Sequence, residues 1–289
     1  MKLLWLVIDK FRLRLKIAIA IFFILISTMF LITCSNEPKQ EIRNDFKKYY
    51  QEFNVDGSFA LFNENENKFI LFNQGQFNKA FSPASTFKIC NSLIGLETGV
   101  IPNKHYVLAW DSVKRNPIWD QNHSLESAFK NSVVWYYQEL ARRVGKDKMK
   151  YWVNKANYGN KNIGGGIDKF WLEGSLRISP KQQIEFIRQL YFDQLPFSKR
   201  NMSLVKEMML VKDSLGYKIH AKSGWGMDGD HDIGWFVGYI KTNDNVYFFS
   251  NCIHIKTKEL EDINKAIIFD KCRIDISNLI FKELHLVQF

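Results

Sequence analysis

Short runs rich in β-branched and aromatic residues occur towards both ends of the chain and predict strands there. Near the N-terminal end, residues 58–62 and 68–72 flank the polar stretch 63–67, a pattern typical of a β-hairpin. The C-terminal third contains three further runs of this kind, at 217–223, 233–241 and 246–254. Polar residues 242–245 separate the last two runs and predict a second antiparallel hairpin.

The middle of the chain instead shows apolar residues at helical spacing. Ser82 and Pro83 predict the start of a helix, with Ser82 as its N-cap and Pro83 at its first position, ending near Thr98. Ser179 and Gln182 form a capping box before another helix. Helical spacing also occurs within 125–129, 137–144, 184–191 and 276–284, whereas 36–52 is expected to be a linker into a first helix and 103–123 to be irregular.

This order of elements predicts an α/β (α+β) protein with one central antiparallel sheet assembled from both ends of the chain. Helices near the N- and C-termini flank the sheet, and a mostly helical subdomain at about 86–200 is inserted between its strands. The chain has 289 residues, of which 46% are hydrophobic and 24% charged, an ordinary globular composition. This composition excludes an intrinsically disordered chain, a collagen-like repeat and a polytopic membrane protein.

The net charge of +10 is concentrated partly at the start of the chain, since residues 1–33 hold five basic residues and one acidic residue. The remaining residues carry 35 basic and 29 acidic side chains, and no run of five basic residues occurs among them. A nucleic-acid-binding protein would be expected to show a basic stripe or a recognition motif. We therefore predict no nucleic-acid partner.

Residues 17–32 form an uncharged apolar run that follows a basic stretch, the pattern of an export leader. Three interpretations stay open: residues 1–33 are a cleaved signal peptide, a retained membrane anchor, or a lipoprotein leader that ends before a lipidated Cys34. Each of them places residues 34–289 outside the cytoplasmic membrane, in the periplasm or at the extracytoplasmic membrane face. Membrane attachment through Cys34 or the leader is thus an expectation.

The remaining cysteines, Cys90, Cys252 and Cys272, lack the spacing of a metal site and are expected to be buried free thiols. The chain contains no HExxH sequence. The run Asp230-His231-Asp232 lies in a glycine-containing loop and is interpreted as a polar turn. No metal site is predicted.

The pattern Ser-x-x-Lys occurs three times, at Ser85–Lys88, Ser127–Lys130 and Ser203–Lys206. On a helix, this spacing places the hydroxyl and the amine on one face, so that a neutral lysine could take the serine proton. The first pair differs from the others because Ser85 is expected in the first turn of a capped helix, where free N–H groups favour developing negative charge. The apolar residues Phe87 and Ile89 beside this pair favour a dry pocket.

A second motif, Lys222-Ser223-Gly224, is expected at a strand edge. There it would offer a cationic side chain, a hydroxyl and a backbone N–H to an anionic acyl substrate, with the glycine allowing a close approach. Ser-x-x-Lys on an early helix combined with Lys-[Ser/Thr]-Gly on a late strand is the pairing found in β-lactamases and penicillin-binding proteins.

Over roughly residues 45–285 the chain resembles the class D (oxacillinase-type) β-lactamases. The resemblance rests on five motifs in the same order: Ser85-Thr86-Phe87-Lys88, Ser132-Val133-Val134, Tyr158-Gly159-Asn160, Asp168-Lys169-Phe170-Trp171-Leu172-Glu173-Gly174 and Lys222-Ser223-Gly224. It implies the penicilloyl-serine transferase fold and hydrolysis of the β-lactam amide of penicillin-type antibiotics through an acyl-enzyme, and so antibiotic resistance. Two residues depart from the family pattern: Ser223 where threonine is commoner, and Trp135 where many members have proline.

The resemblance also implies a role for each catalytic residue. Ser85 would be the nucleophile, and Lys88, N-carboxylated by carbon dioxide or bicarbonate, would be the general base. Trp171 would donate its indole N–H to that carbamate, although the residue alone would suggest core packing. Ser132 would pass a proton to the leaving nitrogen, with Lys222 beside it supplying positive potential. No other cofactor is implied.

The same resemblance assigns a second group of residues to substrate binding. Val134 would shield the lysine from bulk water, while Ser223 and Gly224 would lie along the substrate. The backbone N–H groups of Ser85 and Trp225 would form the oxyanion hole. Arg273, expected just before the last helix, would bind the substrate carboxylate. Glu173 invites interpretation as a base, but its place in the family pattern is structural.

Two alternative functions stay open. A β-lactam-sensing receptor domain would look similar and stay acylated, but such proteins carry several membrane segments before the sensor, whereas this chain contains at most one. A low-molecular-weight D,D-peptidase usually shows Ser-x-Asn where this chain has Ser132-Val133-Val134. A non-enzymatic interaction protein would not need Ser85, Lys88 and Lys222 in register. The sequence predicts neither the oligomeric state nor the range of β-lactams attacked.

Overall fold

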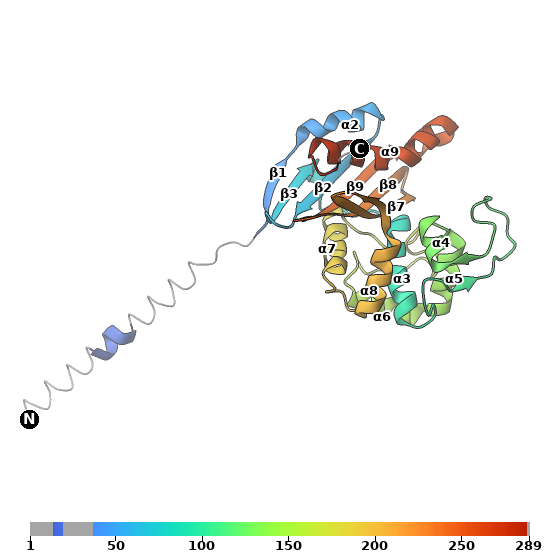
Figure 1. Cartoon of the computed structure of the whole chain (residues 1–289), viewed down its shortest axis with the longest axis horizontal. Helices are drawn as coiled ribbons and strands as arrows, with labels where there is room; N and C mark the ends of the chain where they lie inside the picture. The colour runs from blue at the N-terminus through green and yellow to red at the C-terminus, as the bar shows by residue number, and fades with distance from the viewer. Residues whose placement is uncertain (1–13, 20–36, 288–289) are drawn as a thin grey trace, which may run out of the picture. The chain divides into compact units, whose positions relative to one another are not determined.

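The computed structural model describes residues 14–19 and 37–287 of the chain (Figure 1). The predicted leader is therefore represented only by residues 14–19, which are helical, and Cys34 lies outside the described residues. Within these two ranges, no helix combines the length and the hydropathy needed to cross a membrane. The compact part of the protein begins at Lys39.

A seven-stranded sheet with the order β1-β3-β2-β9-β8-β7-β6 lies at the centre of this compact part. Its strands are β1 (Lys39–Ile42), β2 (Asp56–Asn63), β3 (Lys68–Phe72), β6 (Leu210–Ser214), β7 (Tyr217–Asp228), β8 (His231–Thr242) and β9 (Val246–Lys256). All neighbouring strands are antiparallel except β1 and β3, which are parallel. The predicted sheet and both predicted hairpins, β2–β3 and β8–β9, are confirmed.

Both faces of the sheet are covered by helices, which explains why its strands read as nearly continuous apolar runs. Helices α2 (Lys47–Glu52) and α9 (Ile263–Glu283) pack on one face, where Phe59 and Leu61 of β2 point. Ala60 and Phe62 of the same strand belong to the core on the opposite face. That face carries the helices α3 (Lys88–Glu97), α4 (Leu125–Lys130), α5 (Val134–Val144), α6 (Lys146–Lys155), α7 (Pro180–Tyr191) and α8 (Lys199–Met208) (Figure 1).

Two local predictions were wrong, and both concern helix starts. Ser82 does not cap a helix: a 3₁₀ turn, η3 (Ala84–Phe87), precedes α3, and the Ser82 hydroxyl donates to backbone carbonyls of the 168–178 loop instead. Helix α9 begins about a dozen residues earlier than its apolar spacing indicated, because Asp262 caps it by accepting the N–H of Asn264. Arg273 therefore lies inside α9 and not before it.

Two further outcomes follow from capping and exposure. The capping box at Ser179 and Gln182 is present at the start of α7, as predicted. Strand β1 lies in the segment expected to be a linker, and its residues are mostly exposed at the sheet edge, so that no apolar alternation marked it.

The three cysteines expected to be buried free thiols, Cys90, Cys252 and Cys272, are free and buried in the structure.

Candidate active site

The first element of the site is the Ser85–Lys88 pair, at the junction of η3 and α3. The Lys88 Nζ donates to the Ser85 Oγ at 2.6 Å, and the two residues are 0% and 7% exposed, with Lys88 the more buried. Burial holds the pKa of Lys88 well below its ordinary value, and the nearby positive charge of Lys222 lowers it further. A neutral amine at hydrogen-bond distance can accept the hydroxyl proton, so this pair has the geometry of a nucleophile and its base.

The backbone around Ser85 is held in an unusual conformation. Ala84, directly before it, has a φ of +47°, in the left-handed region that a residue with a Cβ seldom adopts. The turn is pressed against β7: a Cβ added at Gly224 would lie 3.2 Å from the backbone nitrogen of Thr86, and one at Gly226 would lie 2.9 Å from the Ala84 Cβ. Glycine at both positions lets β7 run directly beside the turn that carries Ser85.

A second pair joins β7 to the loop between α4 and α5. The Lys222 Nζ donates to the Ser132 Oγ at 3.1 Å and to the carbonyl of Ser223 at 2.9 Å. Ser132 also has a positive φ, +54°. Burial lowers the pKa of Lys222 to about 7, and the charge of Arg273 adds to this effect. Two lysines with depressed pKa values in one site are typical of a catalytic centre rather than of a surface.

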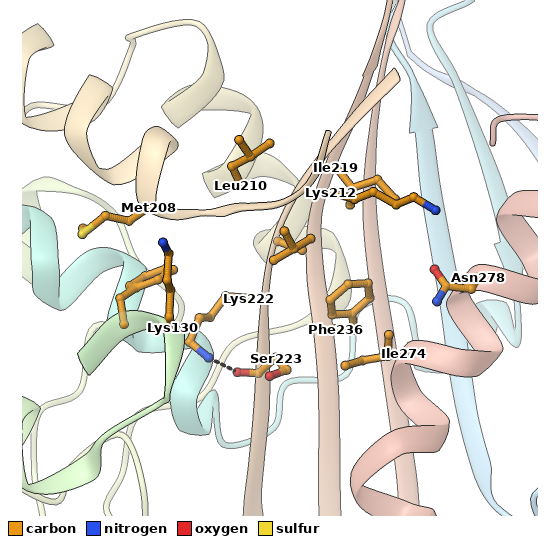
Figure 2. A pocket seen from close by; sticks show the side chains of 13 residues that line it. Lys130, Met208, Leu210, Lys212, Ile219, Lys222, Ser223, Phe236, Ile274 and Asn278 are labelled. Atoms are coloured by element: carbon orange, nitrogen blue, oxygen red, sulfur yellow. Dashed lines mark hydrogen bonds between the residues drawn. The ribbon is translucent and has the colours of Figure 1, made fainter. Parts of the chain in front are cut away.

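Lys222 and Ser223 also line a cavity of about 470 Å³, together with apolar side chains and further polar ones (Figure 2). Phe236 and Ile219 of the sheet form part of its wall. The centroid of the Phe129 ring, which lines the same cavity, lies 5.7 Å from the Lys222 Nζ. With these apolar groups beside it and only 5% of the residue exposed, the ammonium form of Lys222 loses hydration that the neutral amine does not need.

Trp171 lies behind the Ser85–Lys88 pair in the aromatic core. It is 0% exposed, and its ring packs against Phe170 at 5.0 Å and against Phe87, the neighbour of Lys88, at 5.6 Å between centroids. Its indole N–H has no hydrogen-bond partner in the described part of the chain. A buried donor left unpaired costs about 1–3 kcal/mol, so this nitrogen marks a place where an acceptor fits.

A cleft of about 610 Å³ opens onto these groups. Seven of the predicted site residues line it: Ser85, Ser132, Val134, Ser223, Gly224, Trp225 and Arg273. Lys88 and Trp171 lie behind this lining, and the Lys222 amine reaches it through Ser132. The structure therefore brings all ten predicted residues to one site, from η3, α3, the α4–α5 loop, α5, the 168–178 loop, β7 and α9.

At the α9 side of the cleft lies Arg273, whose guanidinium has hydrogen-bond acceptors for only some of its N–H groups. Its guanidinium donates to the Asp270 carboxylate at 2.7 Å and to the Phe269 carbonyl at 3.3 Å, while its buried Nε has no partner among the described residues. Trp225 lies close by, with its ring 5.4 Å from that of Phe269 and its indole N–H donating to Asp232. This side of the cleft suits a carboxylate on a partly apolar ligand.

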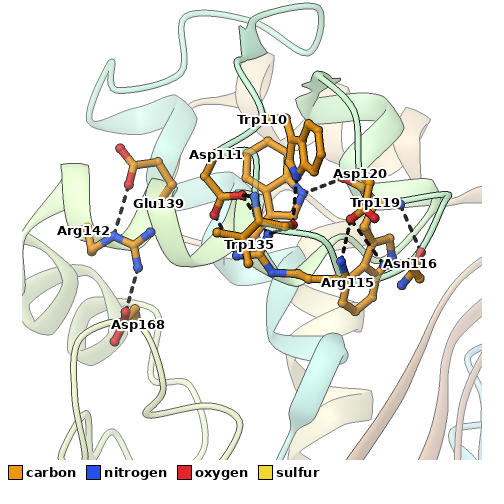
Figure 3. Close-up of polar contacts among 11 residues, drawn as sticks. Trp110, Asp111, Arg115, Asn116, Trp119, Asp120, Trp135, Glu139, Arg142 and Asp168 are labelled. Carbon is orange, nitrogen blue, oxygen red and sulfur yellow. Dashed lines mark hydrogen bonds and ion pairs between the residues drawn. The ribbon is translucent and has the colours of Figure 1, made fainter.

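The 103–123 segment, expected to be irregular, is held by many side-chain hydrogen bonds, several of which are drawn in Figure 3, and two of its residues line the cleft. Arg115 pairs with both carboxylate oxygens of Asp111, at 2.8 and 2.7 Å. The indole N–H of Trp135 donates to the Trp119 carbonyl, and that of Trp119 donates to the Asn131 carbonyl beside Ser132. Trp119 and Ile118 consequently line the cleft, although no periodicity in the sequence pointed to them.

The run Asp230-His231-Asp232 forms no metal site. His231 contacts the Asp230 carboxylate at 2.7 Å, whereas Asp232 accepts the Trp225 indole N–H. Across residues 14–19 and 37–287, no three His, Cys, Asp or Glu side chains are grouped in a way that could hold a metal ion.

Comparison with known proteins agrees with this geometry. The penicillin binding protein transpeptidase domain family matches residues 38–272 of the chain. The β-lactamase OXA-48 of Klebsiella pneumoniae is 40% identical over 220 residues, covering 76% of this chain and 83% of that protein. The class D β-lactamase YbXI from Nostoc has a similar structure, with a TM-score of 0.78 and 40% identity over 85% of this chain and all of its own.

A relative with a different name matches over the same part of the chain. The regulatory protein BlaR1 of Bacillus licheniformis is 33% identical over 214 residues, which make up 73% of this chain but only 35% of BlaR1.

Proposed function

The chain belongs to the class D β-lactamases, and we propose that it hydrolyses the β-lactam amide of penicillin-type antibiotics through an acyl-enzyme on Ser85, with N-carboxylated Lys88 as the general base. The observation that carries this proposal is the buried contact of 2.6 Å between Ser85 and Lys88. Burial favours the neutral form of the amine by lowering its pKa, and the neutral form both accepts a proton and reacts with carbon dioxide.

In the acylation step, the base at position 88 takes the Ser85 proton while the Ser85 oxygen forms a bond to the β-lactam carbonyl carbon. The amide C–N bond then breaks, and the ring nitrogen receives the Ser132 hydroxyl proton. Lys222, which donates to the Ser132 Oγ, would return a proton to Ser132 and stabilise the oxygen in the meantime. The backbone N–H groups of Ser85 and Trp225 would hold the carbonyl oxygen; losing one such donor costs roughly 10²–10³ in rate.

The residues around Lys88 fit a carbamate on its amine. The buried indole N–H of Trp171 lacks an acceptor among the described residues, and a carbamate oxygen would provide one. Once carboxylated, Lys88 would be an oxygen base for both the serine proton and the water that releases the acyl group. Val134 lines the cleft beside Ser132, where it would limit the access of bulk water.

Substrate binding would use the cationic side of the cleft. Penicillins carry a carboxylate next to the ring nitrogen, and the partly satisfied guanidinium of Arg273 is suited to pair with it. Ser223 would add a hydroxyl, and Gly224 would allow the substrate to lie against β7. Trp119 and Ile118 offer an apolar surface for the side chain of the antibiotic.

The test is hydrolysis of the chromogenic β-lactam nitrocefin by purified protein, followed by intact-mass measurement during and after turnover. A hydrolase gives sustained colour and a mass that returns to that of the free protein. A receptor of the β-lactam-sensing kind would give one equivalent of colour and a lasting mass increase, and a D,D-peptidase would release D-alanine from a cell-wall peptide. Either of the last two results would contradict the proposal.

We further propose that the protein is exported and acts in the periplasm or at the extracytoplasmic membrane face, protecting the cell from β-lactams. Residues 17–32 and the basic stretch before them support this proposal. Mass measurement of the mature protein distinguishes a cleaved leader, a retained leader and a lipidated Cys34. Recovery of the unprocessed chain from the cytoplasm of an expressing bacterium would contradict export.

A further inference from the structure

Ser82, three residues before the nucleophile, connects three separate segments of the protein. It is 1% exposed, and its hydroxyl lies 3.2 Å from the carbonyl of Trp171 and 3.0 Å from that of Leu172, donating to both. Its carbonyl accepts the indole N–H of Trp235 on β8 at 2.8 Å. Its own N–H donates to the Asp228 carboxylate at the end of β7, at 3.3 Å.

An ion pair closes this set of contacts into a ring. The other oxygen of Asp228 lies 3.1 Å from the guanidinium of Arg177, and both side chains are partly buried. Arg177 in turn donates to the carbonyls of Gly174 and Leu176, at 2.7 and 2.9 Å. The ring thus runs from the Ser85 turn to the end of β7, from there to the 174–177 loop, and back through Trp171 to Ser82.

This closed set of contacts includes the backbone carbonyl of Trp171, whereas the Trp171 indole has only packing contacts. The Trp171 carbonyl accepts both the Ser82 hydroxyl and the Ala84 N–H, the latter at 3.0 Å. Its indole N–H, by contrast, is unpaired and free of any directional restraint among the described residues. The position of that N–H therefore depends on the packing of the ring and on the hydrogen bonds to the Trp171 carbonyl, one of which comes from the Ser82 hydroxyl.

We propose that Ser82, supported by the Asp228–Arg177 ion pair, is a positioning residue that aligns Trp171 with Lys88. Its loss would weaken retention of the carboxyl group on Lys88 without removing a group that touches substrate. The inference rests on the proposed function, because it requires that Lys88 is carboxylated. It predicts a change in the bicarbonate dependence of turnover rather than a general loss of activity.

The experiment measures steady-state turnover of nitrocefin against bicarbonate concentration in degassed buffer. For Ser82→Ala we expect the half-saturating bicarbonate concentration to rise about fivefold, the effect of one lost hydrogen bond, with near wild-type turnover at saturation. Asp228→Asn keeps an acceptor for the Ser82 N–H but loses the ion pair, so its shift should be smaller. If Ser82→Ala does not fold, Asp228→Asn carries the test alone, and an unchanged bicarbonate dependence then overturns the proposal.

Two controls match these changes elsewhere in the protein. Thr98→Val removes a partly buried hydroxyl that donates to two backbone carbonyls at the end of α3, and Glu64→Gln breaks the partly buried ion pair with Arg188. Neither control should shift the bicarbonate dependence. A shift of equal size in the controls would overturn the proposal, because the effect would then be general destabilisation.

A double variant tests whether Ser82 acts through Trp171. If it does, Ser82→Ala should add nothing to the bicarbonate dependence of Trp171→Phe, since contacting residues that act as a unit are not additive. Additive shifts would contradict this inference and leave the proposed function intact. A wild-type enzyme that hydrolyses nitrocefin with no bicarbonate dependence at all would instead overturn carboxylation of Lys88 itself, and with it the role of Ser82.

Discussion

Ser85–Lys88 and Ser127–Lys130 share the Ser-x-x-Lys spacing but lie in different surroundings. In the first pair the amine is fully buried and touches the hydroxyl at 2.6 Å. In the second, on α4, the Lys130 side chain is 57% exposed and lies 3.5 Å from Glu126. The Ser127 hydroxyl is meanwhile engaged with the Ser124 carbonyl and the His123 ring.

The difference shows that spacing brings a hydroxyl and an amine to one helix face, whereas burial favours the neutral amine that the proposed nucleophile and base require. Lys88 has no acidic partner in the described structure to stabilise its charge, and the nearby cation Lys222 lowers its pKa further. Lys130 has both water and a carboxylate. Ser203–Lys206 resembles the second case, because the Lys206 amine pairs with Asp193 at 2.8 Å. Substitutions at Lys88 and at its exposed counterparts should therefore have very different effects.

The largest expected effect is that of Ser85→Ala. Without the hydroxyl, no bond to the β-lactam carbonyl can form, so covalent labelling by penicillin and turnover should both disappear. Ser127→Ala and Ser203→Ala should be labelled like the wild type. Intact-mass spectrometry after exposure to penicillin checks this result, and a penicilloyl adduct on Ser85→Ala would refute the assignment of the nucleophile.

The next largest effect is expected for Lys88→Ala. A general base contributes about 10²–10⁴-fold, so turnover should fall by at least that factor, and any acyl-enzyme that still forms should persist. Lys206→Ala should retain its rate, since its amine pairs with Asp193 and its side chain does not line the cleft, as that of Lys130 does. Stopped-flow acylation and steady-state turnover separate the two steps. Near wild-type turnover by Lys88→Ala would remove the functional distinction between the two lysines.

A third prediction concerns stability and uses Lys222, the other buried lysine. Because its pKa is about 7 in the folded protein and near 10.5 when unfolded, only the unfolded chain binds this proton between those values. Between about pH 7 and pH 10.5, the free energy of unfolding of the wild type should therefore rise with pH more steeply than that of Lys222→Met. The stability gain of Lys222→Met should be largest below about pH 7, of the order of 3 kcal/mol after the lost hydrogen bonds are deducted. It should fall steadily towards pH 10.5, where only the loss of the hydrogen bonds remains and the variant should be slightly less stable than the wild type.

Urea unfolding of Lys222→Met and wild type at several pH values measures this gain. Lys130→Met is the matched control, and its stability difference from wild type should not change with pH. Equal pH profiles for Lys222→Met and Lys130→Met would mean that burial does not disfavour the Lys222 ammonium, and the contrast between buried and exposed lysines would then fail.

A smaller effect is expected for Trp171→Phe, which keeps most of the ring and removes the unpaired N–H. We expect deacylation to slow about tenfold, with a smaller effect on acylation, because a carbamate in an apolar pocket needs donors. Added bicarbonate should partly restore the variant and affect the wild type less. Burst and steady-state rates, measured with and without bicarbonate, compare acylation and deacylation in Trp171→Phe and in the wild type. An unchanged deacylation rate would mean that Trp171 is only a packing residue.

Much of the fold was predictable because its elements carry local signals. Both hairpins have turn residues between apolar runs, and the start of α7 has the capping box of Ser179 and Gln182. The start of α9 was missed although Asp262 precedes it as a cap and Ile263 and Ile267 lie at helical spacing. These first turns are exposed and add nothing to the core-facing stripe from which the helix was predicted. Ser82 looked like a cap because a capping serine and a serine that bonds a distant loop have the same local sequence.

The site was predictable where its chemistry resides in side chains at a recognisable spacing, as for Ser85, Lys88 and Lys222. It was not predictable where the role arises from backbone conformation or long-range packing. The positive φ of Ala84 is imposed by the loop and strand packed around it. Trp119 is held at the cleft by hydrogen bonds of its carbonyl to Trp135 and of its indole to Asn131. Neither contact leaves a pattern in the sequence.

The central claim is that Lys88, unlike Lys130, is held as a neutral amine that can be carboxylated. ¹³C NMR of the protein equilibrated with ¹³C-bicarbonate tests it most directly. We predict one carbamate carbon signal in the wild type and in Lys130→Ala, absent from Lys88→Ala, and weakening as the pH falls and protonation of the amine competes with carboxylation. An active wild-type enzyme without this signal at saturating bicarbonate, or a signal that survives in Lys88→Ala, would contradict the claim.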